Sequence, residues 1–474
     1  MDVHAPPGRE HRGLPSALVL TAASALLWGT AHLFAGRTRA GLALLTAQVV
    51  LVAGVLATLT ALRFRLVSLA LRPEWLAGLI VAVLLAGAAW VAVVLLSYRA
   101  VRPAGGARRA VARVALGALC VLVVIPFAYT ARLAYVSRDV LTTLFAAGAE
   151  TDARDPWDGR PRVSILLIGA DAAKNRPGAR TDSMTVATID TETGRTVLFG
   201  LPRNLERVPM PDGPARRWFP YGFTGDGTAS TPGLLNEVYQ WAEDHPDIVP
   251  GVPDGRRGPL LLKRTVAGVL GIPVDYYAMV DMKGFQELID AIGGVVVTVK
   301  SDIPYGMQGN VLPAGTRRLS GREALWFGRS RSDGSDYVRM SRQKCLLYAV
   351  ARQADPMTVL HGFERIADAA KRHVSTDIPR DLLPALVELG VKARDSQLRS
   401  LQFVPPLIDT ANPDWWLIRR KVAAALEPAK PRLDRAADPS ADPSGDRPGT
   451  PSAPPSAPPS PAPDEPVSLD DACA

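Results

Sequence analysis

The sequence predicts a helical membrane region followed by a mixed α/β domain, and two patterns support this. Hydrophobic residues make up 47% of the 474 residues, but long uninterrupted apolar segments occur only before residue 135. From residue 160 to residue 425, short apolar runs alternate with amphipathic helices and turn residues, which is typical of one mixed α/β domain around a central sheet. Past Pro428 the chain is mostly Pro, Ser, Ala and Asp, a composition that cannot bury a core and predicts disorder.

These patterns predict four regions along the chain. The predicted boundaries are a membrane region at 1–135, a linker at 136–160, a folded domain at 161–426 and a disordered tail at 427–474. The net charge of +8 favours an anionic partner such as phosphate, nucleic acid or a lipid surface. The positions of Cys120, Cys345 and Cys473 indicate neither a metal site nor a disulfide framework.

The membrane region contains four apolar segments, at about 14–34, 41–62, 75–98 and 111–131. The last three are long enough to cross about 30 Å of hydrocarbon. The first carries Gly29, Thr30 and His32, and we expect it to be a short or re-entrant segment that does not cross.

Arginine positions decide between three and four crossings, because loops on the cytoplasmic side are enriched in Arg and Lys. Four crossings would place seven arginines on each side. Three crossings leave five outside (Arg63, Arg65, Arg72, Arg132 and Arg138) and nine inside (Arg9, Arg12, Arg37, Arg39, Arg99, Arg102, Arg108, Arg109 and Arg113). The sequence therefore favours three crossings, with everything after residue 135 outside the cytoplasm.

Charged residues follow or precede the first three strands of the domain at particular ends. The predicted strands are 163–168, 184–189 and 196–201. The last two flank a hairpin turn at 191–194, so Asp182 and Arg203 should share one sheet edge, and an antiparallel first strand would bring Asp171 there too. Two carboxylates and an arginine suit a divalent metal beside a phosphate. Ordinary charges on a solvated rim are the alternative.

The rest of the domain follows from periodicity and end signals. A helix at 259–270 is expected to end at Gly271, since glycine favours the left-handed conformation that follows many helices. Ser320 with Glu323 forms a capping box that begins a helix running to about residue 327. For residues 209–258, which are rich in Gly, Pro and charged residues, the sequence predicts a long, partly ordered insertion. The other predicted elements are helices at 234–242, 284–292, 337–354 and within 380–394, and strands at 276–280, 295–299 and 398–404.

A second charged cluster lies at 326–344. Arg329 and Arg331 flank the end of one predicted helix, and Arg339 and Arg342 share a face of the next. Four guanidiniums this close repel one another unless an anion or acidic side chains neutralise them, and Arg suits bidentate contacts to phosphate. The alternative is a solvated basic helix that pairs with the acids of the intervening loop, Asp333 and Asp336. Nucleic acid is a disfavoured anion, since the domain lacks a recognisable nucleic-acid-binding module.

The two clusters, in this order and spacing, resemble the LytR–CpsA–Psr (LCP) family of cell-wall glycopolymer transferases. The multi-span N-terminal region and the Pro-rich tail resemble actinobacterial members. The matching stretches are ILLIGAD (165–171), RTDSM (180–184), LPRN (201–204), GIPVDYYAMVDMKGFQELIDAIGGVVV (271–297), LSGREALWFGRSR (319–331) and SDYVRMSRQ (335–343).

The resemblance implies an α/β/α catalytic domain outside the membrane. It implies a pocket for a polyprenyl-diphosphate-linked glycan, with Mg²⁺ (or Mn²⁺ as the alternative) on the diphosphate. The enzyme would be a metal-dependent phosphotransferase that moves the glycan phosphate onto a peptidoglycan hydroxyl. Its partners would be this carrier, peptidoglycan and membrane lipid, with no nucleic acid.

The resemblance also assigns roles to individual residues. Asp171 and Asp182 match the metal-binding acids, and either could act as the base. Arg203, Arg331 and Arg339 match the diphosphate-binding arginines. The assigned helpers are Arg180, Arg329 and Arg342, and by analogy alone a lipid pocket takes Leu270, Phe285, Leu288, Ile289 and Ile292, whose alternative role is ordinary core packing. Asn204 departs from the family, which often has an acid there.

Three other functions stay open at this point. A pyrophosphatase would use the same residues with water as acceptor. A non-catalytic membrane regulator would bind the lipid diphosphate without turnover. A cytoplasmic DNA-binding regulator is the least favoured, because the domain is expected outside the cytoplasm.

The topology gives a direct prediction. A reporter enzyme that is active only outside the cytoplasm should be active when it is fused after residue 160, because an odd number of crossings places the domain outside. The measurement is reporter activity in intact cells, with a fusion before residue 14 as the opposite-side control. A cytoplasmic signal from the later fusion would contradict the three-crossing topology.

Overall fold

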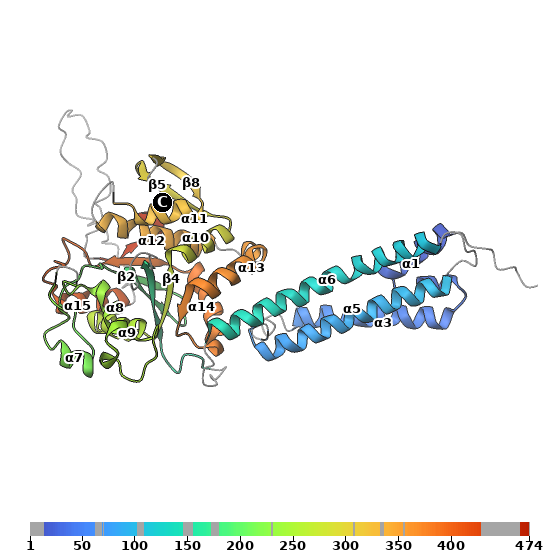
Figure 1. Ribbon diagram of the computed structural model, residues 1–474, viewed down its shortest axis with the longest axis horizontal. Helices are drawn as coiled ribbons and strands as arrows, with labels where there is room; N and C mark the ends of the chain where they lie inside the picture. Colours follow the sequence, from blue (N-terminus) through green and yellow to red (C-terminus); the bar gives the residue numbers. More distant parts are fainter. Residues whose placement is uncertain are drawn as a thin grey trace, which may run out of the picture. The chain divides into compact units, whose positions relative to one another are not determined.

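The computed structural model divides the chain into two units (Figure 1). One unit comprises residues 1–150 with 379–384, and the other comprises residues 151–378 with 385–474. Each is considered by itself. The described residues are 14–61, 69, 71–101, 109–145, 155–171, 180–228, 231–306, 309–331, 336–353, 356–427 and 465–473.

Among its described residues, the first unit contains three helices that are long and apolar enough to cross a membrane. They are α3 (Thr38–Ala61), α5 (Pro73–Val101) and α6 (Arg109–Leu144). These match the three segments expected to cross, while crossing itself and its direction stay predictions. The helix α6 continues to Leu144, so the predicted linker at 136–160 is helical in its first part, because the apolar pattern of the span runs on without a helix-ending signal.

The first apolar segment is broken in the structure. It forms α1 (Leu14–Leu26) and the short α2 (Thr30–Phe34), separated at Gly29, whose φ is 88°. The Gln48 side chain accepts a hydrogen bond from the Trp28 backbone N–H and donates one to the Leu26 carbonyl. The break therefore leaves backbone groups that a side chain of α3 satisfies, as apolar surroundings require.

The second unit is built on a seven-stranded mixed sheet, which confirms the predicted fold class. The strand order is β11-β10-β3-β2-β1-β4-β9. The β1–β4 and β3–β10 pairs are parallel and the others are antiparallel. The strands are β1 (Arg162–Asp171), β2 (Arg180–Asp190), β3 (Thr196–Leu201), β4 (Tyr276–Asp281), β9 (Val374–Thr376), β10 (Leu398–Gln402) and β11 (Val467–Ser468).

Helices cover both faces of this sheet (Figure 1), which gives the expected α/β/α layers. Side chains alternate along a strand, so Leu166 and Ile168 of β1 enter the main core while Leu167 faces the other layer. The main-core layer contains α8 (Val238–Asp244), α9 (Arg257–Leu270) and α15 (Trp415–Leu426). The other layer contains α10 (Met282–Ala291), α11 (Gly321–Arg329) and α12 (Asp336–Gln353), with α13 (Pro356–His373) packed on α10.

Smaller elements complete the unit. Two short antiparallel pairs, β5 (Val295–Val299) with β8 (Gly315–Leu319) and, between them in the sequence, β6 (Ile303–Tyr305) with β7 (Asn310–Leu312), add a second apolar cluster with α10, α11 and α12. The Ser320–Glu323 capping box is present and confirms the predicted start of α11. Gly271 caps α9 with a φ of 69°, as predicted. The helix α14 spans Leu383–Asp395.

The stretch at 209–258 is more than a partly ordered insertion. Met210, Phe223 and Val238 are buried in the main core, and the stretch forms α7 (Pro214–Trp218), α8 and two short 3₁₀ turns. Outside the predicted helix at 234–242, its apolar residues are spaced irregularly among Gly, Pro and charges, so no helical or strand period marks them as core. The sequence prediction is corrected on this point.

The C-terminal segment at 465–473 corrects two further predictions. Residues 428–464 of the predicted disordered tail lie outside the described residues, but beyond them β11 pairs with β10 and Leu469 is fully buried. Cys473 forms a disulfide with Cys345 of α12, at a sequence separation of 128. No local spacing could predict this bond, because the two cysteines meet only through tertiary structure. The helix α16 (Leu469–Ala472) lies beside α12, where Asp470 accepts a hydrogen bond from Tyr348.

The disulfide should stabilise the second unit measurably. Replacing Cys473 by Ser is expected to lower the free energy of unfolding by about 2–4 kcal/mol, because the bond restricts the unfolded chain, and to lower Tm by roughly 5–10 °C. Thermal unfolding without reductant is the measurement. The matched control is Cys120→Ser, which removes the free cysteine and should leave Tm of this unit unchanged. Three reactive thiols in the unreduced, unfolded wild-type chain would contradict the bond.

Candidate functional site

A β-bulge places the first acidic residues of the site. Gly169 of β1 pairs with Ser183 and Ala170 pairs with Thr181, so Asp182 is an extra residue on β2. A bulge re-aims the side chains beside it. As a result Asp182 and its neighbour Ser183 both face the same cavity, although adjacent residues of a regular strand point to opposite faces. The antiparallel β1–β2 pairing also confirms the predicted arrival of Asp171 at this edge.

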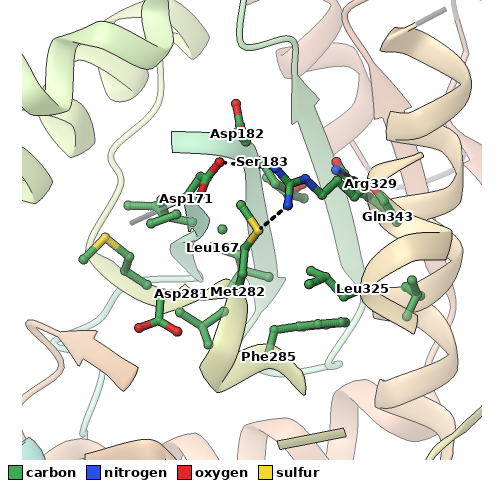
Figure 2. Close-up of a pocket in the computed structure, with 18 of the residues that line it drawn as sticks. Leu167, Asp171, Asp182, Ser183, Asp281, Met282, Phe285, Leu325, Arg329 and Gln343 are labelled. Carbon is green, nitrogen blue, oxygen red and sulfur yellow. Dashed lines mark hydrogen bonds and ion pairs between the residues drawn. The ribbon is translucent and has the colours of Figure 1, made fainter. Parts of the chain in front are cut away.

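The cavity lies between the sheet and the layer of α10, α11 and α12, and has a volume of about 360 Å³. Figure 2 shows Asp171, Asp182 and Arg329 towards one end, with Phe285 and Leu325 towards the other. The walls between them are mostly apolar side chains, among them Leu167, Ala278, Met279, Val280, Leu346 and Leu347. An apolar cavity with charged side chains at one end suits a ligand that is apolar at one end and anionic at the other.

The carboxylates at the charged end pair with arginines. Asp171 is 8% exposed and lies 3.5 Å from a guanidinium nitrogen of Arg329, measured from Oδ2 to Nη2 (Figure 2). Arg203 Nη1 donates to Asp182 Oδ1 at 2.5 Å, because the β2–β3 hairpin places both residues at one end of the sheet. The sequence prediction that Asp182 and Arg203 share an edge is thus confirmed.

Residues of the second charged cluster reach the same edge. Arg339 of α12 is only 3% exposed, and its Nη2 donates to the Asp182 carbonyl at 3.3 Å and to Asp336 at 2.8 Å. Arg203 lines an adjoining hollow that shares Asp182 and Arg339 with the cavity. The two clusters, which are far apart in sequence, therefore meet at one place.

Burial and neighbouring charge act on Arg339. Burial lowers the pKa of its guanidinium below the ordinary value, Arg203 and Arg331 lower it further, and Asp336 and Asp182 oppose them. A cation whose charge is disfavoured by its surroundings gains more from an added anion than a solvated one does. The surroundings of Arg339 therefore favour the binding of a negatively charged group beside it.

The fit of a divalent ion depends on the donors present. Within the described residues, no group of three or more His, Cys, Asp and Glu side chains could hold a metal. Asp171 and Asp182 nevertheless line one cavity, and Mg²⁺ is commonly held by one or two carboxylates together with the oxygens of a bound phosphate. Asp171 and Asp182 are the carboxylates that would hold such an ion together with a bound phosphate.

Several predicted site residues lie elsewhere. Arg180 is exposed opposite Asp171 in the β-ladder and is not among the cavity residues. Arg342 turns away from the cavity: its Nη2 donates to the Ser330 carbonyl at 2.6 Å and its guanidinium lies over the Phe327 ring. Arg331 pairs with Asp336 at 3.1 Å and is half-exposed. Through its contacts with Ser330 and Phe327, Arg342 stabilises the packing of α12 against the end of α11.

The predicted lipid pocket is corrected in most of its members. Only Phe285 lines the cavity. Leu270 lies in the main core on the other side of the sheet, and Ile289 and Ile292 belong to the cluster under β5 and β8. Leu288 is not a cavity residue either. Helical spacing alone identified an apolar face of each helix, but it could not show which neighbour that face meets.

The structure adds residues that sequence reasoning missed. Ser183 and Gln343 line both the cavity and the adjoining hollow. Gln343 lies one helical turn after Arg339, a spacing that places both on one face and could have identified it. Asn204, which stands where the family often has an acid, donates to Thr410 Oγ1 at 3.1 Å.

Comparisons with known proteins show what the whole sequence is similar to. The LytR_cpsA_psr family model matches residues 141–411. The polyisoprenyl-teichoic acid–peptidoglycan teichoic acid transferase TagU of Bacillus anthracis is 27% identical over 221 residues, which cover 46% of this chain and 61% of that protein. The protein of the same name from Oceanobacillus iheyensis is 29% identical over 236 residues, covering 49% and 64%. The chain therefore spans less than two thirds of these curated relatives.

Solved structures resemble the chain more distantly. The crystal structure of TagV from B. subtilis has 24% sequence identity and a TM-score of 0.40, and the match covers 56% of this chain and 96% of that one.

The geometry predicts an anion site that depends on Arg203. Arg203→Ala should raise the Kd of the full-length protein for inorganic pyrophosphate by roughly 10-fold or more, because one charge-assisted hydrogen bond contributes about 1.5–3 kcal/mol. Isothermal titration calorimetry measures this. Arg195→Ala, at the exposed end of the β2–β3 hairpin, should leave Kd unchanged. Equal affinities for the wild type and the Arg203 variant would refute the site.

Proposed function

The protein belongs to the LytR_cpsA_psr family, and from this premise we propose that it transfers a glycopolymer from a polyprenyl-diphosphate carrier to a hydroxyl of peptidoglycan. The polymer is teichoic-acid-like or another secondary wall polysaccharide, and the product is a phosphodiester link. The named relatives are teichoic acid transferases. The observation that carries the proposal is one cavity whose apolar walls end at Asp171, Asp182, Arg329 and Arg339.

The apolar part of the cavity suits the polyprenyl chain. Its walls come from β1, β4, α10, α11 and α12, and burying apolar surface stabilises binding by about 25 cal/mol per Å². Phe285 and Leu325 would contact the isoprenoid units (Figure 2). The diphosphate at the head of the chain would then lie at the charged end.

The charged end suits a diphosphate in both charge and geometry. Phosphoryl transfer needs positioning and charge neutralisation more than covalent help from the protein. Arg203 and Arg339 would donate to the phosphate oxygens, with Arg329 beside Asp171 as a further donor. Asp171 and Asp182 would hold a Mg²⁺ ion, or Mn²⁺ as the alternative, which supplies charge neutralisation on the diphosphate and its leaving group when bound.

The reaction exchanges one phosphorus–oxygen bond for another. The acceptor hydroxyl oxygen forms a bond to the glycan-side phosphorus, the bond from that phosphorus to the bridging oxygen breaks, and polyprenyl phosphate leaves. The acceptor proton must pass to a base. Either Asp171 or Asp182 would serve, and Asp182, whose side chain is more exposed than that of Asp171, is the more accessible of the two to an incoming acceptor.

The remaining features of the proposal concern location. The three long apolar helices would anchor the protein as a multi-pass membrane protein, with the catalytic domain extracytoplasmic. A membrane anchor suits the function because both the carrier lipid and the first unit would share one bilayer.

A coupled assay tests the proposal. The full-length protein, a polyprenyl-diphosphate-linked glycan and Mg²⁺ should give glycan covalently joined to added peptidoglycan fragments, detected by mass spectrometry. Chelation with EDTA should abolish the product and added Mg²⁺ should restore it. Asp182→Ala should lower the rate by roughly 10²-fold or more, because the variant loses both a metal ligand and the partner of Arg203.

The controls separate the competing functions. Glu192→Ala, on the exposed hairpin tip, should retain the wild-type rate. Free glycan phosphate formed equally with and without fragments would indicate a pyrophosphatase instead. Tight binding of the carrier without any product would indicate a non-catalytic regulator.

A further inference from the structure

Asp336, the first residue of α12, contacts three arginines of the site. Its Oδ2 lies 2.8 Å from Arg339 Nη2 and 3.6 Å from Arg203 Nε, and its Oδ1 lies 3.1 Å from Arg331 Nε. These arginines come from three different elements: the end of β3, the segment after α11, and α12 itself. One carboxylate therefore connects the residue after β3 to the α11–α12 region, two parts of the fold that are far apart in the sequence.

Asp336 does not itself line the cavity. Arg339 lines the cavity and the adjoining hollow, Arg203 lines the hollow, and Asp336 is in neither set. The carboxylate contacts the arginines without facing the space where a ligand would lie. Its two oxygens are both used by guanidiniums, as a support for those side chains would require.

The charges explain why such a support matters. All three guanidiniums lie within 3.6 Å of one carboxylate, so they are close enough to repel one another. Without an acid between them, that repulsion would turn the side chains away from one another into solvent. Asp182 contacts Arg203 and, through its carbonyl, Arg339, but it also lines the cavity and is needed there. Among the described acids that contact Arg203 or Arg339, Asp336 offsets the repulsion without lining the cavity or the hollow.

We propose that Asp336 is a positioning residue, which holds Arg203 and Arg339 convergent on the diphosphate before the substrate arrives. This inference rests on the proposed function for its effect on catalysis, although the arrangement of the arginines is independent of it. Preorganised donors stabilise transition-state charge without reorganising during the reaction. Loss of Asp336 therefore acts on turnover through the arginines.

A double-mutant cycle on pyrophosphate binding tests the arrangement without any activity. In the wild-type background, Arg203→Ala should raise the Kd for inorganic pyrophosphate by roughly 10-fold. In the Asp336→Asn background the same change should raise it only about 2- to 3-fold, because Arg203 is then no longer aimed at the anion. Additive effects of the two changes would overturn the proposal.

Turnover supplies the second readout. Asp336→Asn should lower kcat of transfer by roughly 10- to 100-fold, and Asp336→Glu should recover part of it, because a carboxylate is restored. The matched control is Asp254→Asn. Asp254 also pairs with an arginine three residues later, Arg257 at the start of α9, but its side chain is exposed to solvent. This variant should change neither kcat nor the pyrophosphate Kd.

The outcomes distinguish the two proposals. If the wild type transfers and Asp336→Asn retains its kcat, or exceeds it, Asp336 is no positioning residue. If the wild type does not transfer at all, the proposed function fails and the binding cycle still decides the role of Asp336. A Tm of Asp336→Asn near that of the wild type, with strong coupling in the cycle, supports positioning, since general unfolding would weaken pyrophosphate binding without coupling to Arg203.

Discussion

Repulsion between guanidinium groups is the constraint on which the site depends. Two like charges 4 Å apart cost about 4 kcal/mol at the effective dielectric near a protein surface, so four arginines cannot gather without compensation. The structure interleaves them with carboxylates: Arg329 with Asp171, Arg203 with Asp182, and Arg203, Arg331 and Arg339 with Asp336. The cluster keeps one more cation than anion, which is the balance expected of a site for an anionic ligand.

The sheet topology meets this constraint by bringing distant segments to one edge. The β1–β2 and β2–β3 pairings carry Asp171, Asp182 and Arg203 there, and the bulge in β2 turns Asp182 into the cavity. The helix α12 reaches the same edge, where Arg339 donates a hydrogen bond to the main-chain carbonyl of Asp182. The fold therefore determines the charge balance of the site, because the acids of β1 and β2 offset part of the positive charge of the arginines from α11 and α12.

Local pattern was sufficient for much of this arrangement. Alternation and the turn at 191–194 predicted the β2–β3 hairpin, and with it the contact between Asp182 and Arg203. Capping signals predicted the ends of α9 and the start of α11. The resemblance carried the rest of the site, and the structure brings Asp171, Asp182, Arg203 and Arg339 to one place.

Contacts that depend on tertiary structure could not be predicted. Leu270 has the period of a helix face, but only the layer order shows that this face meets the core opposite the cavity. The role of Arg342 depends on a carbonyl at the end of α11, and the bond between Cys345 and Cys473 depends on the return of the chain to α12. The irregular apolar residues of 209–258 enter the core for the same reason: their partners lie on other elements.

The position of β11 has a consequence for how the chain is made. Residues 467–468 pair with β10 but are synthesised long after it, so the outer edge of β10 stays unpaired in the nascent chain until they emerge. An unpaired edge strand is a template for pairing with other chains, and incomplete domains are the species most prone to aggregation. A chain that ends anywhere between these two strands would leave the edge of β10 unpaired. It would also expose the apolar surface that Leu469 covers and leave the Cys345 thiol of α12 without its disulfide partner.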